Sequence, residues 1–189
     1  TKDLIREKNP DVVIIATGSQ HRYLTIPGDR SVPVMTAVEV LNKEKDCGAK
    51  PMVLGGGLVG CELALALLKE GKKVTIAETL PDILSSGPKI NFCNKDMLTD
   101  LLHFYHADIR TGVTAERIKD GKVILRGADG RKEEVEADSV CLAVGFLPRQ
   151  ELYRKIQSEP YEIHLLGDAR KVQNIMHAVW DAYEVTRNI

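Results

Sequence analysis

Apolar positions along the chain fall into two patterns, short continuous runs and longer segments with helical spacing. The continuous runs have the length and the β-branched content of buried strands, and they lie at residues 11–16, 51–54, 73–77 and 140–144. Helical spacing covers residues 58–70, 91–105, 150–157 and 174–189, and a short helix is predicted to end near residue 8. Strands that alternate with helices in this way predict an α/β fold with a parallel sheet.

Turn-forming residues separate these elements and indicate where the pattern changes. Residues 20–48 contain many prolines and glycines and only a short helix near residues 36–42, so we interpret them as a crossing between two domains. After residue 106 short strands follow one another without a helix. The turns Asp120-Gly121 and Asp129-Gly130 predict that the strands around them are antiparallel.

A glycine-rich segment, Gly55-Gly56-Gly57-Leu58-Val59-Gly60, lies between the strand at residues 51–54 and the helix that follows it. It satisfies the G-x-G-x-x-G pattern in the strand and helix context that gives the pattern its meaning. Gly55 permits the tight turn, Gly57 lets the backbone approach a pyrophosphate, and Gly60 lets the helix pack close to the strand. The free N–H groups at the start of the helix then favour the negative charge of the phosphates.

Glu78 stands at the end of the next strand, 21 positions after Gly57 (78 minus 57). Dinucleotide-binding sequences have an acidic residue about 20 positions on, whose carboxylate accepts hydrogen bonds from the adenosine ribose hydroxyls. A carboxylate there repels the 2′-phosphate of NADP(H), so the sequence favours NAD(H). The alternative is a chance glycine turn, with Glu78 as a solvated surface acid.

Composition narrows the range of partners. The formal net charge of -1 shows no bias toward nucleic acid, and no apolar run approaches the roughly 20 residues that a membrane span needs. The first residues lack the features of a secretory signal, so the sequence indicates a cytoplasmic protein with no membrane partner. The four cysteines, Cys47, Cys61, Cys93 and Cys141, are too widely spaced for a zinc site or a redox dithiol, and we expect buried, reduced thiols.

Several segments together resemble the flavoprotein reductases that contain two dinucleotide-binding domains. They are residues 11–19, Ile26-Pro27-Gly28, residues 36–41 and residues 55–64. Gly167-Asp168-Ala169-Arg170, followed by the last helix, resembles more specifically the C-terminal region of NADH:flavin oxidoreductases of the enoate reductase and 2,4-dienoyl-CoA reductase type. The resemblance covers nearly the whole chain.

The resemblance implies that an NAD(H)-binding domain is inserted into an FAD-binding domain. Residues 49–145 would be the Rossmann-like NAD(H) domain. Residues 1–48 would be the end of the first half of the FAD domain plus a crossover, and residues 146–189 its C-terminal piece. In this family both domains follow a barrel that binds FMN and an iron–sulfur cluster. The sequence contains neither the FAD fingerprint nor cysteines spaced for a cluster. We therefore expect a fragment that partners the remainder of a parent polypeptide.

The resemblance also implies roles for individual residues. Gly167 and Asp168 would meet the FAD ribityl chain, with Asp168 accepting a hydroxyl hydrogen bond, although a simple turn before a helix is the alternative. Glu62 would lie near the nicotinamide ribose or carboxamide, or else be an exposed helix acid. The segment Ala143, Val144 and Gly145 would approach the nicotinamide through its backbone, and Ala16, Thr17 and Gly18 would lie beside the flavin. Ala182 departs from the family, which often has glycine there.

The implied function of the full protein is hydride transfer from NADH to FAD, which feeds the reduction of an enoate or an enoyl-CoA-like substrate. The cofactors carry that redox chemistry, and no side chain of this chain is assigned as a catalytic acid or base. The isolated fragment is expected to bind NAD(H) but catalyse little. Two alternatives stay open. One is a NADH oxidase or a ferredoxin or rubredoxin reductase, flavoproteins that usually continue into a further domain. The other is a non-enzymatic NADH-sensing domain.

Overall fold

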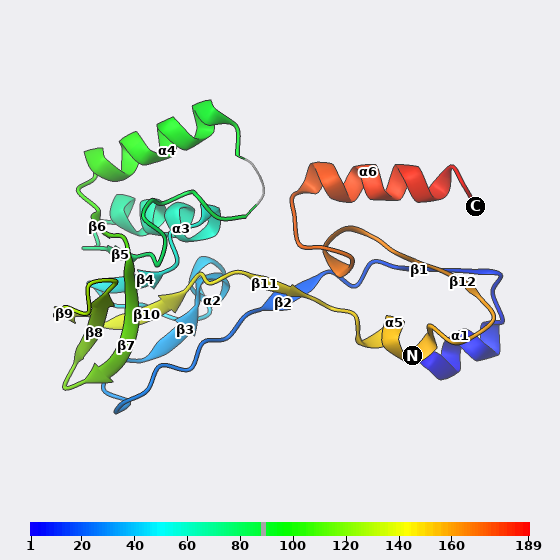
Figure 1. Cartoon of the computed structure of the whole chain (residues 1–189), viewed down its shortest axis with the longest axis horizontal. Helices are drawn as coiled ribbons and strands as arrows, with labels where there is room; N and C mark the ends of the chain where they lie inside the picture. Colours follow the sequence, from blue (N-terminus) through cyan, green and yellow to red (C-terminus); the bar gives the residue numbers. More distant parts are fainter. Residues whose placement is uncertain (88–89) are drawn as a thin grey trace. The chain divides into compact units, whose positions relative to one another are not determined.

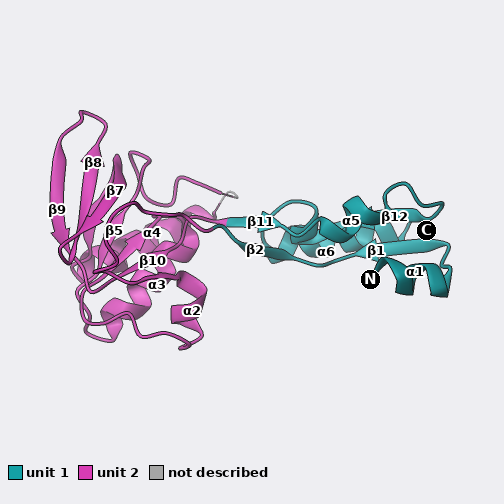
Figure 2. Cartoon of the chain, turned by 90° about the horizontal axis from the view of Figure 1, so that it is seen from below, with its two compact units in different colours: residues 1–22, 146–189 teal, residues 23–145 magenta. Residues whose placement is uncertain are grey.

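A computed structural model describes residues 1–87 and 90–189. The chain forms two compact units (Figure 2). Unit 1 comprises Thr1–Arg22 and Phe146–Ile189, and unit 2 is Tyr23–Gly145. The second boundary coincides with the one expected from the sequence. The first falls after residue 22 rather than after residue 48, because strand β3 (Val34–Thr36) pairs with strand β10 (Ser139–Leu142) and so belongs to unit 2.

The centre of unit 2 is a five-stranded parallel sheet of order β3-β10-β4-β5-β6 (Figure 1). Its other strands are β4 (Pro51–Leu54), β5 (Thr75–Ala77) and β6 (Asp108–Arg110). Helix α3 (Leu58–Lys69) connects β4 to β5, and α4 (Phe92–Phe104) connects β5 to β6. The strand order reverses between β4 and β10. The parallel sheet with its connecting helices confirms the predicted α/β fold, and the reversal of strand order places the end of β4 where such sheets bind ligands.

Both faces of this sheet are covered, which explains why all four residues of each central strand, β4 and β10, are buried. One face packs through Val53, Ile76 and Cys141 against α3, α4 and the short helix α2 (Ala37–Leu41). The other packs through Met52 and Leu142 against a three-stranded sheet. That sheet consists of β7 (Val113–Lys119), β8 (Lys122–Gly127) and β9 (Lys132–Glu136), and its strands are antiparallel, as the turn residues predicted.

Unit 1 is built around a parallel pair of strands, β1 (Val12–Ile15) and β12 (Glu162–Leu165). Helices α1 (Lys2–Lys8) and α5 (Glu151–Ile156) contact one another, and a 3-10 turn (Gly167–Ala169) leads into α6 (Ile175–Thr186). The buried apolar core is small and consists of Val13, Ile15, Ile156 and Ala169. No residue of α6 is buried, and Ile175, Val179 and Trp180 are all more than half exposed.

An antiparallel pair, β2 (Ser19–His21) with β11 (Phe146–Pro148), was not predicted from the sequence. Each strand is only three residues long, which is too short for a periodicity to be recognised, and β2 contains only polar side chains. The strand predicted at residues 140–144 ends at Leu142. In the described part of the chain, no helix combines the length and the apolar content needed to span a membrane.

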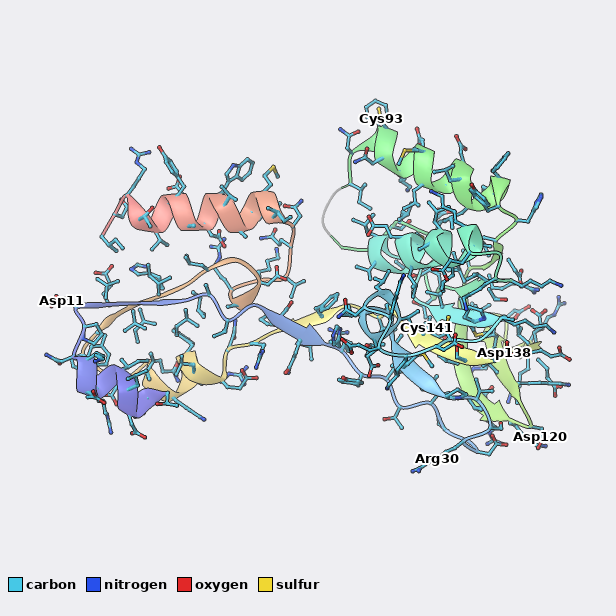
Figure 3. All side chains as sticks on the ribbon, turned by 180° about the vertical axis from the view of Figure 1, so that it is seen from behind. Asp11, Arg30, Cys93, Asp120, Asp138 and Cys141 are labelled. Carbon is cyan, nitrogen blue, oxygen red and sulfur yellow. The ribbon has the colours of Figure 1, made fainter. Side chains whose placement is uncertain are left out.

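The cysteines differ in exposure, which corrects the expectation that all four are buried. Cys47, Cys61 and Cys141 are buried, whereas Cys93 is exposed. Figure 3 shows Cys93 at the start of α4 and Cys141 inside the sheet of unit 2. Leu98 and Leu102 are the buried positions of α4, and Cys93 lies on a different face of that helix.

We expect a single thiol to react rapidly with a maleimide in the native protein. Burial raises the pKa of Cys61 and of Cys141 to about 12, which suppresses the reactive thiolate as well as blocking access. Mass spectrometry after brief labelling should therefore show one adduct, and Cys93→Ser should remove it. Urea-unfolded protein, as the control, should label at all four cysteines. Rapid labelling of a second native thiol would contradict this packing.

A capping box starts α2. The Thr36 hydroxyl accepts from the Glu39 N–H at 3.2 Å, and Glu39 Oε2 accepts from the Thr36 N–H at 2.7 Å. Lys45 Nζ also lies 2.7 Å from Glu39 Oε1. These bonds lower the pKa of Glu39 from 4.5 to about 2. The bond from Lys45 contributes most to this shift, and the bond from the Thr36 N–H contributes next. The charged carboxylate therefore stabilises the folded state above pH 4.5, and this contribution is lost as the pH falls toward 2.

Glu39→Gln should lower the free energy of unfolding by about 1 kcal/mol at pH 7, the usual value of a helix cap. The difference from the unsubstituted protein should shrink as the pH is lowered from 4.5 toward 2, because Glu39 itself then becomes neutral. Urea unfolding followed by circular dichroism at a series of pH values measures both. Glu44→Gln, an exposed acid near the end of the same helix, serves as the matched control. A difference that stays constant across this pH range would show that the charge of Glu39 has no role.

Candidate dinucleotide-binding site

The glycine turn follows β4 and leads directly into α3. Gly55 has a φ of 104°, and its N–H donates to the Ala77 carbonyl at 2.9 Å, so the turn is tied to the end of β5. A Cβ on Gly55 would approach the Ala143 carbonyl oxygen to 2.5 Å, and one on Gly60 would collide with the Gly55 carbonyl oxygen. Gly55 and Gly60 thus have the turn and packing roles that the sequence indicated.

Gly56 and Gly57 are required for a different contact, which sequence reasoning missed. A Cβ on Gly56 would lie 2.8 Å from Ile83 Cγ2, and one on Gly57 would lie 3.1 Å from Ser86 Oγ. Ile83 and Ser86 belong to the loop after β5, and Leu84 of the same loop donates its N–H to the Gly56 carbonyl at 2.7 Å. The run of three glycines therefore lets this loop lie directly against the turn. In the sequence, this contact could have been predicted only from Gly56, a glycine at a position where the G-x-G-x-x-G pattern does not require one.

Glu78 connects the turn, the end of β5 and this loop. Its side chain is buried, with 6% of the residue exposed. Oε2 accepts from the Gly56 N–H at 2.6 Å, and Oε1 accepts from the Leu80 N–H at 2.8 Å and from Thr79 Oγ1 at 3.0 Å. Glu78 is therefore not a solvated surface acid. It holds the backbone of the glycine turn, and its place at the end of β5 is the one expected of a ribose-binding acid.

The charged groups near Glu78 disfavour the additional 2′-phosphate that distinguishes NADP(H) from NAD(H). Arg110 lies beside Ala77 in the register of β6 and β5. Its guanidinium donates to Asp108 at 2.7 Å and to both oxygens of Glu133 at 2.6 and 2.8 Å. The charge of Arg110 is therefore already paired. The hydrogen bond to Asp108 makes the largest contribution to raising the pKa of Arg110, and Glu133 raises it further. The exposed Asp82 adds a negative charge to the loop after β5.

The first turn of α3 is open toward solvent. Gly57 is the N-cap residue and has no side chain to bond the free N–H groups of the helix. The first helical bond in this turn joins the Cys61 N–H to the Gly57 carbonyl at 3.0 Å. Leu58 is 40% exposed, Val59 is half-buried and Glu62 is exposed. This end of the helix can bind an anion through its backbone, while the roles proposed for Glu62 stay predictions.

The segment after β10 lies next to the turn. The Ala143 N–H donates to the Leu54 carbonyl at 2.8 Å, and the Ala143 carbonyl faces Gly55. Val144 is half-buried, and Gly145 is exposed with a φ of 91°, a conformation that suits glycine. The structure thus brings Ala143 and the turn together from distant parts of the sequence, while the approach of this segment to a nicotinamide stays a prediction.

Most of the residues assigned to flavin binding meet at a separate cavity, within unit 1. Ala16, Gly18, Gly167 and Asp168 line a cavity of about 450 Å³ together with the start of α6 and Ala182. Thr17 does not line it. The Thr17 hydroxyl donates to the Arg149 carbonyl at 2.6 Å, and the residue borders another cavity of about 560 Å³.

Asp168 is held at the edge of the 450 Å³ cavity by two hydrogen bonds. Its Oδ2 accepts from Ser19 Oγ at 3.0 Å, and its Oδ1 accepts from the Gln173 N–H at 3.1 Å. The preceding Gly167 has a φ of 54°, and its N–H donates to Asp181 Oδ2 at 3.1 Å. Asp181 also forms an ion pair with Arg170. The turn before α6 is thus a rigid structure, and each carboxylate oxygen of Asp168 retains capacity to accept a further hydrogen bond.

Comparison with known proteins identifies one family over most of the chain. The sequence profile of the pyridine nucleotide-disulphide oxidoreductases matches residues 6–172. Over its whole length the chain is 42% identical to a cinnamate reductase of Clostridium sporogenes, of which it covers 28%. It is 33% identical to an NADH oxidase of Thermoanaerobacter brockii, with 99% of the chain and 29% of that protein covered. The fold matches a 2-naphthoyl-CoA reductase with a TM-score of 0.87 at 27% identity, over 100% of the chain and 28% of that structure.

These matches agree with the resemblance to enoate reductase-type proteins that the sequence motifs indicated. The chain spans less than a third of the length of each of these three relatives.

Glu78→Gln should destabilise the protein by about 1–3 kcal/mol, the range for a buried group that loses its partner. A glutamine has one acceptor oxygen in place of two, so the N–H of either Gly56 or Leu80 would face an amino group. Urea unfolding gives the free-energy difference. Glu136→Gln is the matched control, since the Glu136 side chain forms an exposed ion pair with Lys50, and it should leave stability unchanged. Equal effects of the two substitutions would refute the clamping role of Glu78.

Proposed function

The chain belongs to the pyridine nucleotide-disulphide oxidoreductase family, and from this premise we propose that unit 2 binds NAD(H) and unit 1 contributes to an FAD site. The two cofactors together supply hydride transfer from nicotinamide to flavin, and the chain holds and orients them. The main support for the proposal is the glycine turn at the end of β4, which is held in place by the buried carboxylate of Glu78.

The residues of unit 2 fit a dinucleotide. The open first turn of α3 offers backbone N–H donors, and Gly57 leaves no side chain in front of them. Glu78 has one oxygen that accepts a single protein hydrogen bond, from Gly56, so it retains capacity for a ribose hydroxyl. With Arg110 already paired to Asp108 and Glu133, the charge around Glu78 favours NAD(H) over NADP(H).

The residues of unit 1 fit part of a flavin site. Gly18 and Gly167 line a cavity of this unit, and Asp168 lines it too, with acceptor capacity for a hydroxyl of a ribityl chain. The N-terminus of α6 borders the same cavity, where its dipole favours negative charge. The exposed apolar residues of α6, among them Ile175 and Trp180, are where we propose that the remainder of a longer polypeptide packs.

In the full protein, the electrons are proposed to reduce an electron-poor alkene of the enoate or enoyl-CoA class. The 42% identity to a cinnamate reductase and the fold match to a 2-naphthoyl-CoA reductase support this substrate class. FMN and an iron–sulfur cluster, and the catalytic groups that act on the substrate, would belong to the rest of that protein. A cytoplasmic location stays a prediction from the sequence.

An NADH oxidase is the second candidate, because the identity of 33% to the enzyme of Thermoanaerobacter brockii extends over 99% of the chain. The two candidates share the NADH and flavin steps and differ in the final acceptor. Steady-state assays of the full protein with cinnamate and with dioxygen as alternative acceptors would separate them.

Isothermal titration of the 189-residue chain should show NADH binding at least tenfold more tightly than NADPH. Like charge near Glu78 is the reason for that preference. Glu78→Arg should remove or reverse it, through the added cation and the loss of the acceptor for Gly56. Glu70→Arg makes the same charge change at the exposed end of α3 and should keep the preference. Equal or tighter binding of NADPH by the unsubstituted chain would contradict the assignment to NAD(H).

A further inference from the structure

The loop after Glu78, residues 79–87, forms a second wall beside the glycine turn. It is fixed at its start by the bond from the Leu80 N–H to Glu78 Oε1, and further on by the bond from the Leu84 N–H to the Gly56 carbonyl. The side chains of Ile83 and Leu84 are buried at 8% and 6% exposure. The loop is therefore packed against the turn rather than extending away from it.

This packing brings the hydroxyl of Ser86 next to Gly57. A Cβ built on Gly57 would lie 3.1 Å from Ser86 Oγ, so the hydroxyl lies beside the N-cap residue of α3. Ser86 is exposed, and its hydroxyl makes no hydrogen bond to another residue within the described ranges 1–87 and 90–189. The neighbouring Ser85 differs, because its hydroxyl donates to the Ile83 carbonyl at 3.3 Å.

A hydroxyl in this place complements the backbone donors of the glycine turn. The N–H groups of the first helical turn point along the axis of α3, and a phosphate that they bind would have other oxygens facing sideways. The loop after β5 provides the side wall. Ser86 is the member of that loop whose hydroxyl lies beside Gly57, and a hydrogen bond from a neutral hydroxyl to a phosphate oxygen is of the stronger, charge-assisted kind.

We propose that Ser86 is a phosphate-positioning residue of the dinucleotide site, whose hydroxyl donates a hydrogen bond to the pyrophosphate at the start of α3. The assignment rests on the proposed NAD(H)-binding function and adds a side-chain donor to the backbone N–H groups proposed to bind the phosphates. It also gives Gly57, the third glycine of the run, a second role besides allowing a phosphate to approach the backbone closely. Gly57 lets the serine hydroxyl and the phosphate share one small space.

The test is isothermal titration of the 189-residue chain and its Ser86→Ala variant with NADH, ADP and adenosine. Loss of a hydrogen bond to a charged group should weaken NADH and ADP by about tenfold. Adenosine, which has no phosphate, should bind both proteins equally. Ser86→Thr retains a hydroxyl and should restore most of the affinity for ADP. Ser85→Ala is the matched control and should bind all three ligands as the unsubstituted chain does.

The outcomes separate this inference from the proposed function. If the unsubstituted chain binds neither NADH nor ADP, both fail. If it binds them and Ser86→Ala binds ADP equally well, the role of Ser86 is wrong while the dinucleotide site stands. A proportional loss of adenosine and ADP affinity in Ser86→Ala would also overturn the phosphate assignment, because it would show that the substitution disturbs the loop as a whole. Circular dichroism of each variant verifies that the fold is retained.

Discussion

The hydrogen bond between the Glu78 carboxylate and the Gly56 N–H is the contact on which the geometry of the candidate site depends. A buried carboxylate must have its lone pairs satisfied, and here the partners come from the glycine turn and from the loop after β5. The position of one segment therefore fixes the position of the other. A single acid sets where the backbone donors of α3 begin and how closely the loop can approach them.

That contact is effective because the sheet behind it is rigid. Helices cover one face of the five parallel strands and the antiparallel sheet β7-β8-β9 covers the other, so the ends of β4 and β5 cannot shift independently. The strand order reverses at β4, which leaves room beyond its end for the turn and for the segment that carries Ala143. Unit 2 thus presents preformed backbone donors, and the proposed binding of an anion there would not require a flexible loop to become ordered first.

Unit 1 is built differently and has a different part in the proposed function. Its core contains only four buried apolar residues, and the length of α6 has no buried position. Its rigidity comes from polar contacts such as Asp168 with Ser19 and Asp181 with Arg170, which hold the turn before α6. Under the proposed function, each unit would hold one cofactor, and the cofactors rather than side chains of this chain would carry the redox chemistry.

The sequence by itself determined the α/β class, the β4-α3-β5 unit and the acid at position 78. These depend on patterns that are local, namely strand-length apolar runs, helical periodicity and the fixed spacing of glycines and an acid. Only the tertiary structure decided that β3 joins the sheet of unit 2, that β2 pairs with β11, and that Cys93 is exposed. It also decided that Gly56 and Gly57 face Ile83 and Ser86, and that Glu78 bonds the turn. These features depend on contacts between residues far apart in the chain, and a single sequence contains no periodicity or spacing that encodes such contacts.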